Sequence, residues 1–526
     1  MAKIQHIHSK IIEKVEEEIK KEREVRSAEF ESTLEEVKHL VLAVQEESQD
    51  FASFERILDA TLKSVGLAAC QLFLAQQRCP PKEQKTRNDE GKTFVYKKEK
   101  SYPLRCIFGL GTYTSSQYTR GKRFKSRREL ALLDSKVGLL SQGGLSPNLA
   151  LEAVELSTRM PYEHVHALLK RHYAYAPSTR ALCGLIDFLG PLAGATLDTL
   201  SPLEGDIGII QIDGRGLPII RPEEFEKRCQ PHQKSKKEDM KRGRKRKAAR
   251  PRLKPGEKAK KKKQVTVGVL YTLNREEDGK LSGPEQKNYI AQFGSTEIVF
   301  QRLRAYLDGL QKFEKLMFMS DGAPHYVTLR EQYFPEATAV IDFYHVCEYL
   351  WKAGETVFES GSKELGAFIS ELKGLLLEGK VIEVVASLRE KEAELPRRGP
   401  GSKGRRKRMK DAIKYIETRQ ELMPYAQLRL EGLEIGTGVI ESAVRQVVAI
   451  RFEGPGMRWG AQRPQHLLDL LCLRLSDGWS FFANVLEQWV KEPQARTRMT
   501  PLGVNEKSSQ DPSSQLKQKE DFPIAA

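Results

Sequence analysis

The sequence predicts an α/β core that is interrupted by an all-α insertion and preceded by a mainly helical N-terminal region. Three observations predict this fold class. Two short apolar runs, in "GDIGIIQIDGRG" and "KLMFMSDGAPH", have the length of buried strands, and each leads into an Asp-Gly pair. Strand-like segments, a helix and a β-α-β pattern follow the first run, as in an α/β core. Helical periodicity dominates 9–76 and 350–435.

Length and composition are those of a globular protein of about three domains. The chain has 526 residues, of which 30% are charged. No stretch approaches the roughly 20 apolar residues of a membrane span, and the charged N-terminus lacks the apolar segment of a signal peptide. We therefore expect no membrane association and an intracellular location.

The cysteines predict neither a disulfide framework nor a Cys-rich zinc site. There are seven, an odd number, and no two form a C-x-x-C pair. This pattern is typical of a reducing compartment. Their positions are 70, 79, 106, 183, 229, 347 and 472.

Most of the net charge of +16 lies in one segment. Between Lys234 and Lys263 there are 17 Lys or Arg against three acidic residues, a net charge of +14. Such a run cannot form a core, so we expect a flexible arm. It is either a solubilising loop or, as its charge density favours, an arm that binds phosphate and releases counterions from a polyanion. The expected contacts are Lys241, Arg242, Arg244, Lys245, Arg246 and Lys247.

A second basic cluster, at 397–410, makes a nucleic-acid partner a stronger expectation. Either cluster also has the composition of a nuclear-import signal, so neither identifies the kind of cell.

The chain before residue 201 has three parts. Residues 1–92 are predicted to be helical, and 93–126 are rich in β-formers and turns, which predicts two or three short strands. Within 127–200 we expect three short helices, with Pro161 and Pro177 at first-turn positions. The last two, separated by "AYA", have the dimensions of a helix-turn-helix, although generic helical packing explains the pattern as readily. The sequence identifies no base-reading residues.

The core is expected in 201–349, with the basic arm at 234–263. Further strands are predicted at 264–273, 288–295 and 337–341, with a helix at 296–313. Asp213 and Asp321 each follow an apolar strand and precede a Gly, where α/β folds place reactive groups. The alternative at both positions is a simple Asp-Gly turn.

Two carboxylates at strand ends predict a site for hard cations. Mg²⁺ prefers carboxylate oxygens and keeps several waters. Two such ions can activate a water or a 3′-hydroxyl and stabilise the leaving oxygen during in-line attack on a phosphodiester. Because two carboxylates hold a pair of ions poorly, a third acid is expected on a late helix. Glu441, in a Gly-flanked Val-Ile-Glu-Ser pattern, is the best candidate, and Glu434 and Glu453 are the alternatives.

Four motifs carry a family resemblance: "QIDGRG", "FMSDGAPH", "DFYHVCEYLW" and "GTGVIESA…GPGMRW". In this order they resemble a bacterial insertion-sequence transposase of the Kra or Lre type, in the mutator-like group of Asp-Asp-Glu transposases, over roughly 125–490. The resemblance implies a ribonuclease H-like core, whose first acid lies on the first strand and second acid on the fourth. It implies cleavage and strand transfer of DNA by Asp213, Asp321 and Glu441, with two Mg²⁺ ions for which Mn²⁺ can substitute.

The resemblance assigns further residues. The Asp-x-x-His signature of the group falls on Asp342 and His345, and His345 would contact the scissile phosphate or handle a proton. The alternative is that Asp342 only caps a helix with His345 in its first turn. Arg451 and Arg458 would meet phosphate. Trp459 would stack on an unpaired base, or else it packs inside a group of helices.

The implied partners are double-stranded DNA, as terminal inverted repeats and target, and further copies of the chain in a homodimer or higher oligomer. The implied location is the cytoplasm, at the nucleoid of a bacterium. The insertion at 350–435, a Glu-bearing segment at 436–492 and a polar, disordered tail at 493–526 complete the organisation. Relatives often carry paired cysteines before the β-rich segment, whereas Cys79 stands alone here, so we expect no zinc.

Two other functions remain open. The chain could be a DNA-binding protein whose nuclease centre is inert, although an intact triad argues against this. It could also be a phosphotransferase for small molecules. Such enzymes commonly carry a second Asp two residues from the nucleophilic Asp, where this chain has Gln211, and the basic segment suits a small substrate poorly.

Overall fold

The structure, a computed structural model, is a mixed α/β fold. It describes 2–43, 50–81, 85–87, 93–119, 129–140, 144–200, 203–220, 262–284, 286–309, 313–454, 457–460 and 462–491. Most of the basic arm, including all six of its expected phosphate contacts, and the tail from 493 lie outside these residues. The chain divides into two compact units. The first comprises Met1–Ala153, Tyr162–Leu185 and Leu486–Ala526, and the second comprises Val154–Pro161 and Ile186–Val485.

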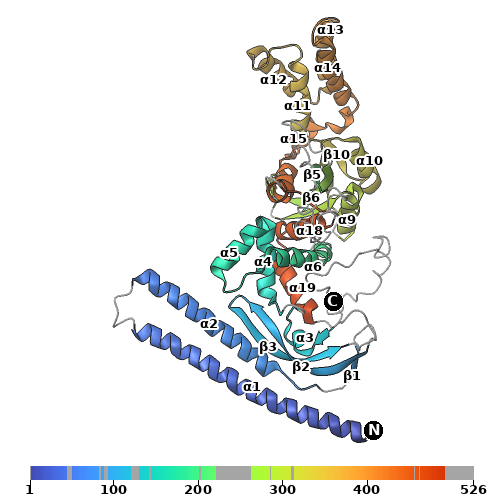
Figure 1. Cartoon of the computed structure of the whole chain (residues 1–526). Helices are drawn as coiled ribbons and strands as arrows, with labels where there is room; N and C mark the ends of the chain where they lie inside the picture. Colours follow the sequence, from blue (N-terminus) through green and yellow to red (C-terminus); the bar gives the residue numbers. More distant parts are fainter. Residues whose placement is uncertain are drawn as a thin grey trace, which may run out of the picture. The chain divides into compact units, whose positions relative to one another are not determined.

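The first unit begins with two long helices that pack along each other (Figure 1). α1 spans Ala2–Ala43 and α2 spans Phe51–Gln77. The Asp50 side chain caps α2 by accepting a hydrogen bond from the Ser53 N–H, one of the donors that a first helical turn leaves free. The helical character expected for 9–76 is confirmed.

A four-stranded antiparallel sheet follows in the same unit. Its strands, in spatial order, are β1 (Lys85–Arg87), β2 (Thr93–Cys106), β3 (Gly109–Thr119) and β4 (Glu129–Ala131). The expected short strands of 93–126 are therefore one long hairpin, β2 with β3. β1 lies within 1–92, where only helices were expected, because its residues pair with the start of β2. α2 packs on β3, and buried Leu74, Leu104 and Tyr113 belong to one apolar cluster of this unit.

Two helices are long and apolar enough to cross a membrane by length and composition alone, α2 and α6 (Thr179–Leu197). The expectation that no segment approaches a membrane span is therefore wrong on these two criteria. Core helices of soluble proteins meet the same criteria, and 44% of the most apolar window of α6 is buried, against 11% for α2. Two such helices are a weak indication of a membrane span.

The region expected to hold a helix-turn-helix consists of helices. α3 (Leu132–Val137), α4 (Pro147–Arg159), α5 (Tyr162–His172) and α6 follow one another. The second half of α6 packs closely on α18 (Arg463–Leu475), since a Cβ at Gly190 would lie 2.3 Å from the Cβ of His466. This half of α6 is a core helix, so it cannot also lie in a DNA groove.

A mixed sheet forms the centre of the second unit. Its strands are β5 (Ile207–Pro218), β6 (Lys262–Arg275), β7 (Leu281–Ser282), β8 (Lys287–Phe293), β9 (Lys315–Ser320) and β10 (Thr338–Ile341). They lie in the order β10-β9-β5-β6, and both β7 and β8 pair with β6. β6 is antiparallel to β5 and β8, whereas β9 and β10 run parallel to β5.

Asp213 does not end its strand. β5 continues to Pro218, and Gly214 pairs with Thr266 of β6 in an unbroken register. The Asp-Gly turn considered for this position is therefore absent. β5 is buried from Ile207 to Ile212, as is typical of a central strand that has parallel and antiparallel neighbours and is covered on both faces.

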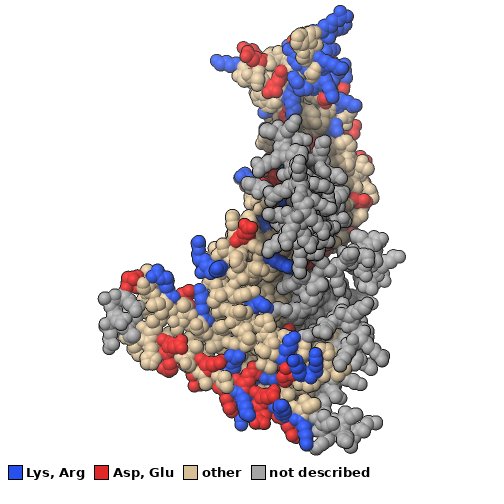
Figure 2. All heavy atoms as spheres, viewed as in Figure 1, with Lys and Arg blue, Asp and Glu red and all other residues tan. Residues whose placement is uncertain are grey.

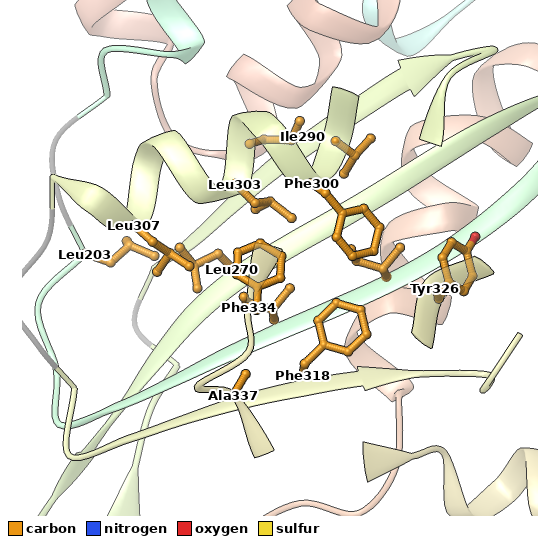
Figure 3. Packing of buried hydrophobic residues seen from close by; sticks show 13 residues of the cluster. Leu203, Leu270, Ile290, Phe300, Leu303, Leu307, Phe318, Tyr326, Phe334 and Ala337 are labelled. Atoms are coloured by element: carbon orange, nitrogen blue, oxygen red, sulfur yellow. The ribbon is translucent and has the colours of Figure 1, made fainter. Parts of the chain in front are cut away.

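An aromatic core covers one face of the sheet. It joins β9 to two helices, α9 (Thr296–Asp308) and α10 (Pro324–Tyr333). The ring centroid of Phe300 lies 5.6 Å from that of Phe318 and 5.8 Å from that of Phe334 (Figure 3). Each such pair adds about 0.5–1.5 kcal/mol to the stabilisation from burial alone. Because Phe318 belongs to β9, this packing also fixes the chain just before Asp321.

The insertion after β10 is helical, as expected, and Figure 1 shows α12, α13 and α14 grouped apart from the sheet. Its elements are α11 (Phe343–Gly354), α12 (Lys363–Leu377), α13 (Val381–Glu394), α14 (Ser402–Glu417), a 3-10 turn at Gln420–Leu422 and α15 (Tyr425–Leu430). The chain then returns through α16 (Gly438–Val444), a π-helical turn at Arg445–Ala449 and α17 (Ile450–Phe452) to α18 and α19 (Trp479–Lys491).

Candidate active site

Three acids meet at one edge of the mixed sheet. The registers that pair β5 with β9, and β9 with β10, reach the residues just before these acids. When the registers are continued, Asp213, Asp321 and Asp342 stand in one row across three adjacent parallel strands. This edge is the carboxyl end of those strands, where open α/β sheets bind their ligands.

Asp213 is half-buried on β5, and its Oδ1 accepts a hydrogen bond from the Gly214 N–H at 2.6 Å. Burial raises the pKa of Asp213 above its ordinary value, and the negative charge of Asp321 raises it further. Nearby His345 and Arg215 act in the opposite direction. Asp213 and Asp321 are therefore close enough to repel each other, and a bound cation would relieve that repulsion.

Asp321 lies in a turn that only Gly322 can complete. Gly322 has a φ of +72°, and a Cβ at this position would lie 2.7 Å from the Cδ1 of Ile341. The Oδ1 of Asp321 accepts a hydrogen bond from the Ala323 N–H at 2.8 Å. The Asp-Gly turn that the sequence allowed at this position is therefore present.

Asp342 is the N-cap of α11, and the residue is only 4% exposed. Its Oδ2 accepts a hydrogen bond from the N–H of His345, and its Oδ1 accepts hydrogen bonds from the N–H groups of Tyr344 and Thr437. Both oxygens are thus used by backbone donors. Asp342 therefore caps α11, as the alternative for this residue proposed, and it also holds the segment before α16; its catalytic role stays a prediction.

His345 stands in the first turn of α11, half-buried, with its Nδ1 4.0 Å from the Oε2 of Glu348. Its positive charge, when protonated, lowers the pKa of both Asp213 and Glu441. The structure therefore brings His345 close to both acids.

Glu441 lies in the first turn of α16 and is exposed to solvent. Partial burial raises the pKa of its carboxyl group, and the negative charges of Asp342 and Asp213 add to the shift. The π-helical turn that follows α16 is a feature found often at functional sites. Glu441 thus shares its surroundings with Asp213 and His345.

The two alternative acids are held in other contacts. Glu453 accepts two hydrogen bonds from the Arg215 guanidinium, each at 2.7 Å. Glu434 accepts a hydrogen bond from the Tyr271 hydroxyl at 3.0 Å. Neither acid is among the charges that shift the pKa of Asp213, whereas Asp213 does shift the pKa of Glu441. The side-chain contacts of Glu453 and Glu434, and the charge interaction between Asp213 and Glu441, favour Glu441 among the three candidates.

Gln211 connects the strand of Asp213 to the helix of Glu441, a role that the sequence did not reveal. It is fully buried, and its Oε1 accepts a hydrogen bond from the Ile440 N–H at 3.0 Å. Its Nε2 donates to the Tyr271 hydroxyl at 2.9 Å and contacts the Gly436 carbonyl at 3.5 Å. The amide therefore fixes the start of α16 against β5 and β6.

The donor set suits a hard divalent cation in its chemistry, because it consists of carboxylate oxygens with mutually repelling charges. Within the ranges that the structure describes, no group of three or more His, Cys, Asp or Glu side chains is arranged to hold a metal ion. Mg²⁺ is usually held by only one or two carboxylates and several waters. The residues present therefore fit a hydrated ion on Asp213 and Asp321, with Glu441 in its outer surroundings.

Three residues near the end of the core were expected to contact DNA, and the structure buries two of them, Arg451 and Trp459. Arg451 is 2% exposed and donates to the Ser157 carbonyl at 2.7 Å, so the expected phosphate contact is wrong for this residue. Trp459 is 7% exposed, its Nε1 donates to the Phe452 carbonyl, and the Arg451 guanidinium lies 5.3 Å from its ring centroid. The packing alternative therefore holds for Trp459. Arg458 is exposed to solvent.

Comparison with the profiles of known protein families gives no match, and comparison with curated proteins also gives none.

Proposed function

We propose that this chain is a DNA transposase with a ribonuclease H-like core, which cleaves and joins DNA strands with the help of divalent cations. The observation that carries the proposal is the placement of Asp213 and Asp321 side by side at one edge of the mixed sheet, with Glu441 close enough to Asp213 for their charges to interact. Acids from adjacent strands and a late helix that converge on divalent cations would supply the chemistry of in-line attack on a phosphodiester.

The strand order supports the ribonuclease H-like core. β5, β6 and β8 form an antiparallel succession, and β9 and β10 then add in parallel on the other side of β5. Asp213 is on the first strand of this succession, and Asp321 directly follows the fourth. This is the placement of acids that the motif resemblance implies.

A Mg²⁺ ion, or Mn²⁺ in its place, would supply the positive charge that activates a water or a 3′-hydroxyl and stabilises the leaving oxygen. Asp213 and Asp321 would hold the cation, and Glu441 would orient its water ligands. His345 is positioned to donate a hydrogen bond or a proton to the phosphate. Asp342 and Gln211 hold the backbone on which these side chains stand.

Surface charge supports DNA as the substrate. The segment 397–410 contains eight Lys or Arg and no acidic residue. Figure 2 shows Lys and Arg side chains gathered over α13 and α14. Dense positive charge of this kind binds the phosphate backbone independently of sequence. The same reasoning applies to the basic arm at 234–263, and the proposed partners include further copies of the chain on the terminal repeats.

The alternative is a DNA-binding protein whose nuclease centre is inert. The lack of a converged three-ligand group among the described residues is the observation in its favour. A phosphotransferase for small molecules is less well supported. Gln211, at the position of its second acid, is instead fully buried and bonded to Ile440 and Tyr271.

Strand cleavage of a terminal-repeat duplex with Mg²⁺ tests the proposal. We expect Asp213→Ala, Asp321→Ala and Glu441→Ala to lose cleavage while they keep DNA binding. Glu371→Ala is the matched control, because it removes an exposed acid of α12 and should cleave like the wild type. If the wild type did not bind DNA, both the transposase and the inert DNA-binding protein would be excluded. Binding without any cleavage, in the wild type as in the variants, would select the inert alternative.

A further inference from the structure

Three side chains of the all-α insertion donate hydrogen bonds to the backbone at the candidate active site. The Tyr415 hydroxyl donates to the carbonyl of Asp321 at 2.7 Å. The Nε of Arg419 donates to the carbonyl of Gly322 at 2.9 Å, and the Tyr425 hydroxyl donates to the carbonyl of Ile341 at 2.9 Å. Two of these carbonyls directly follow β9, and the third belongs to the last residue of β10.

The positions of these carbonyls explain why such contacts matter. A backbone carbonyl that is withdrawn from water needs a donor, and past the end of a strand the sheet no longer supplies one. Gly322 is itself buried and in the left-handed region, with a φ of +72°. The Asp321–Gly322 turn therefore depends on side-chain donors for its conformation, and the insertion provides them.

Tyr415 is held firmly enough to act as a fixed donor. It is 8% exposed, and its ring stacks on that of Tyr349 with centroids 3.9 Å apart and an angle of 6° between the planes. The guanidinium of Arg419 covers the ring at 4.4 Å from its centroid. A stacked aromatic ring with a cation over its face has little freedom to move its hydroxyl.

The rest of α14 packs against other helices of the second unit and so holds Tyr415 in place. Buried residues of α14 pack against α11 and α13, and α11 is the helix that Asp342 caps and that carries His345. The end of α14 is thus connected to the candidate site in two ways, through α11 and through the Asp321 turn.

We propose that Tyr415 and Arg419 are positioning residues that hold the Asp321–Gly322 turn in the conformation that binds the cation. The insertion is then a structural part of the active site. It does not serve only as a separate surface for DNA. This inference rests on the proposed function, because it assumes that Asp321 is a metal ligand.

The test measures Mn²⁺ binding to the full-length protein by electron paramagnetic resonance of the free ion, without DNA. Tyr415→Phe removes one hydroxyl and keeps the stacked ring. We expect it to weaken Asp321-dependent Mn²⁺ binding about five-fold, the factor that corresponds to one ordinary hydrogen bond. Arg419→Lys, which loses the directed Nε donor, should weaken it similarly. Cleavage by both variants should recover at high Mn²⁺ concentration.

Tyr349→Phe is the matched control, since it removes a hydroxyl from the ring that stacks on Tyr415. Within the described part of the chain, the Tyr349 hydroxyl makes no hydrogen bond to the turn, whereas the Tyr415 hydroxyl does. It should bind Mn²⁺ like the wild type. In an Asp321→Ala background, Tyr415→Phe should have no further effect, because the ligand that it positions is gone.

The outcomes separate the two proposals. If the wild type binds Mn²⁺ through Asp321 and both Tyr415→Phe and Arg419→Lys bind it equally well, the positioning role is wrong and the proposed metal site stands. If Tyr349→Phe weakens binding as much as Tyr415→Phe, the effect is one of general packing and the inference also fails. If the wild type shows no Asp321-dependent binding, the metal site and the inference that rests on it are both wrong.

Discussion

The Oδ1 of Asp342 accepts a hydrogen bond at 3.1 Å from the backbone N–H of Thr437, 95 residues further along the chain. Asp342 follows β10, and Thr437 directly precedes α16, the helix of Glu441. One carboxylate therefore joins the end of the sheet to the helix that supplies the proposed third acid.

Asp342→Ala should destabilise the protein, because it leaves the N–H groups of Tyr344, His345 and Thr437 without their acceptor. Loss of a helix cap together with a buried acceptor costs about 2–4 kcal/mol. The free energy of unfolding from urea denaturation measures this. Asp342→Asn keeps one side-chain oxygen and should recover a large part of the loss. Equal losses in the two variants would mean that capping is not the reason.

Gln211→Leu should also destabilise the protein, by about 1–3 kcal/mol, since it leaves the Ile440 N–H unpaired in the interior. Cleavage should fall as well, because the start of α16 is no longer fixed, while DNA binding should persist. Gln446→Ala is the control on the adjacent turn, where the side chain is exposed and bonds only to Ser442. Its free energy of unfolding should stay within about 0.5 kcal/mol of the wild-type value.

Gly322→Ala should cost more stability than Gly361→Ala. Both glycines have a positive φ, +72° and +81°, but only Gly322 lacks space for a Cβ, which would meet Ile341 at 2.7 Å. Gly361→Ala reports the conformational cost alone, about 1–2 kcal/mol. Thermal unfolding of the two variants separates the steric from the conformational part. A smaller loss for Gly322→Ala would contradict the tight turn at Asp321.

Asp213→Asn should stabilise the metal-free protein at neutral pH, by about 1–2 °C in the thermal midpoint. The pKa of Asp213 is raised in the folded protein, so the folded state binds more protons than the unfolded state above pH 3.8, and wild-type stability falls as pH rises through the folded pKa. The advantage of the variant should therefore shrink as the pH is lowered toward 4. Added Mn²⁺ should reverse it, because the ion stabilises only the charged carboxylate. A pH-independent difference would rule out this explanation.

Neutralising the basic cluster at 397–410 should weaken DNA binding with little regard to DNA sequence. Arg397, Arg398, Lys407 and Arg408 are exposed. Changing all four to Gln should reduce the slope of log affinity against log salt by about 0.9 for each phosphate that the variant no longer neutralises. Lys280→Gln is the single-charge control. Lys280 lies outside the cluster but in the same unit, and 83% of its side chain is exposed. An unchanged slope would exclude the cluster as a phosphate-binding surface.

Local patterns in the sequence were sufficient to predict the elements. Apolar runs identified β5 and β9, the 3.6-residue period identified the helices of the insertion, and the Gly after Asp321 identified a change of chain direction. These predictions succeed because each depends on neighbouring residues alone. The same local reasoning failed at Asp213, where the Asp-Gly pair suggested the end of a strand and β6 instead continues the pairing.

The sequence by itself determined the candidate acids and the sign of the surface charge, since both depend only on residue type and order. Only the tertiary structure decided which acids influence one another, because pairing of β5 with β9 joins residues more than one hundred positions apart. It also decided that Arg451 is buried against Ser157, and that Gln211, Tyr415 and Arg419 hold the backbone of the site. A hydrogen bond between distant residues leaves no local pattern in a single sequence, so these roles appear only once the chain is folded.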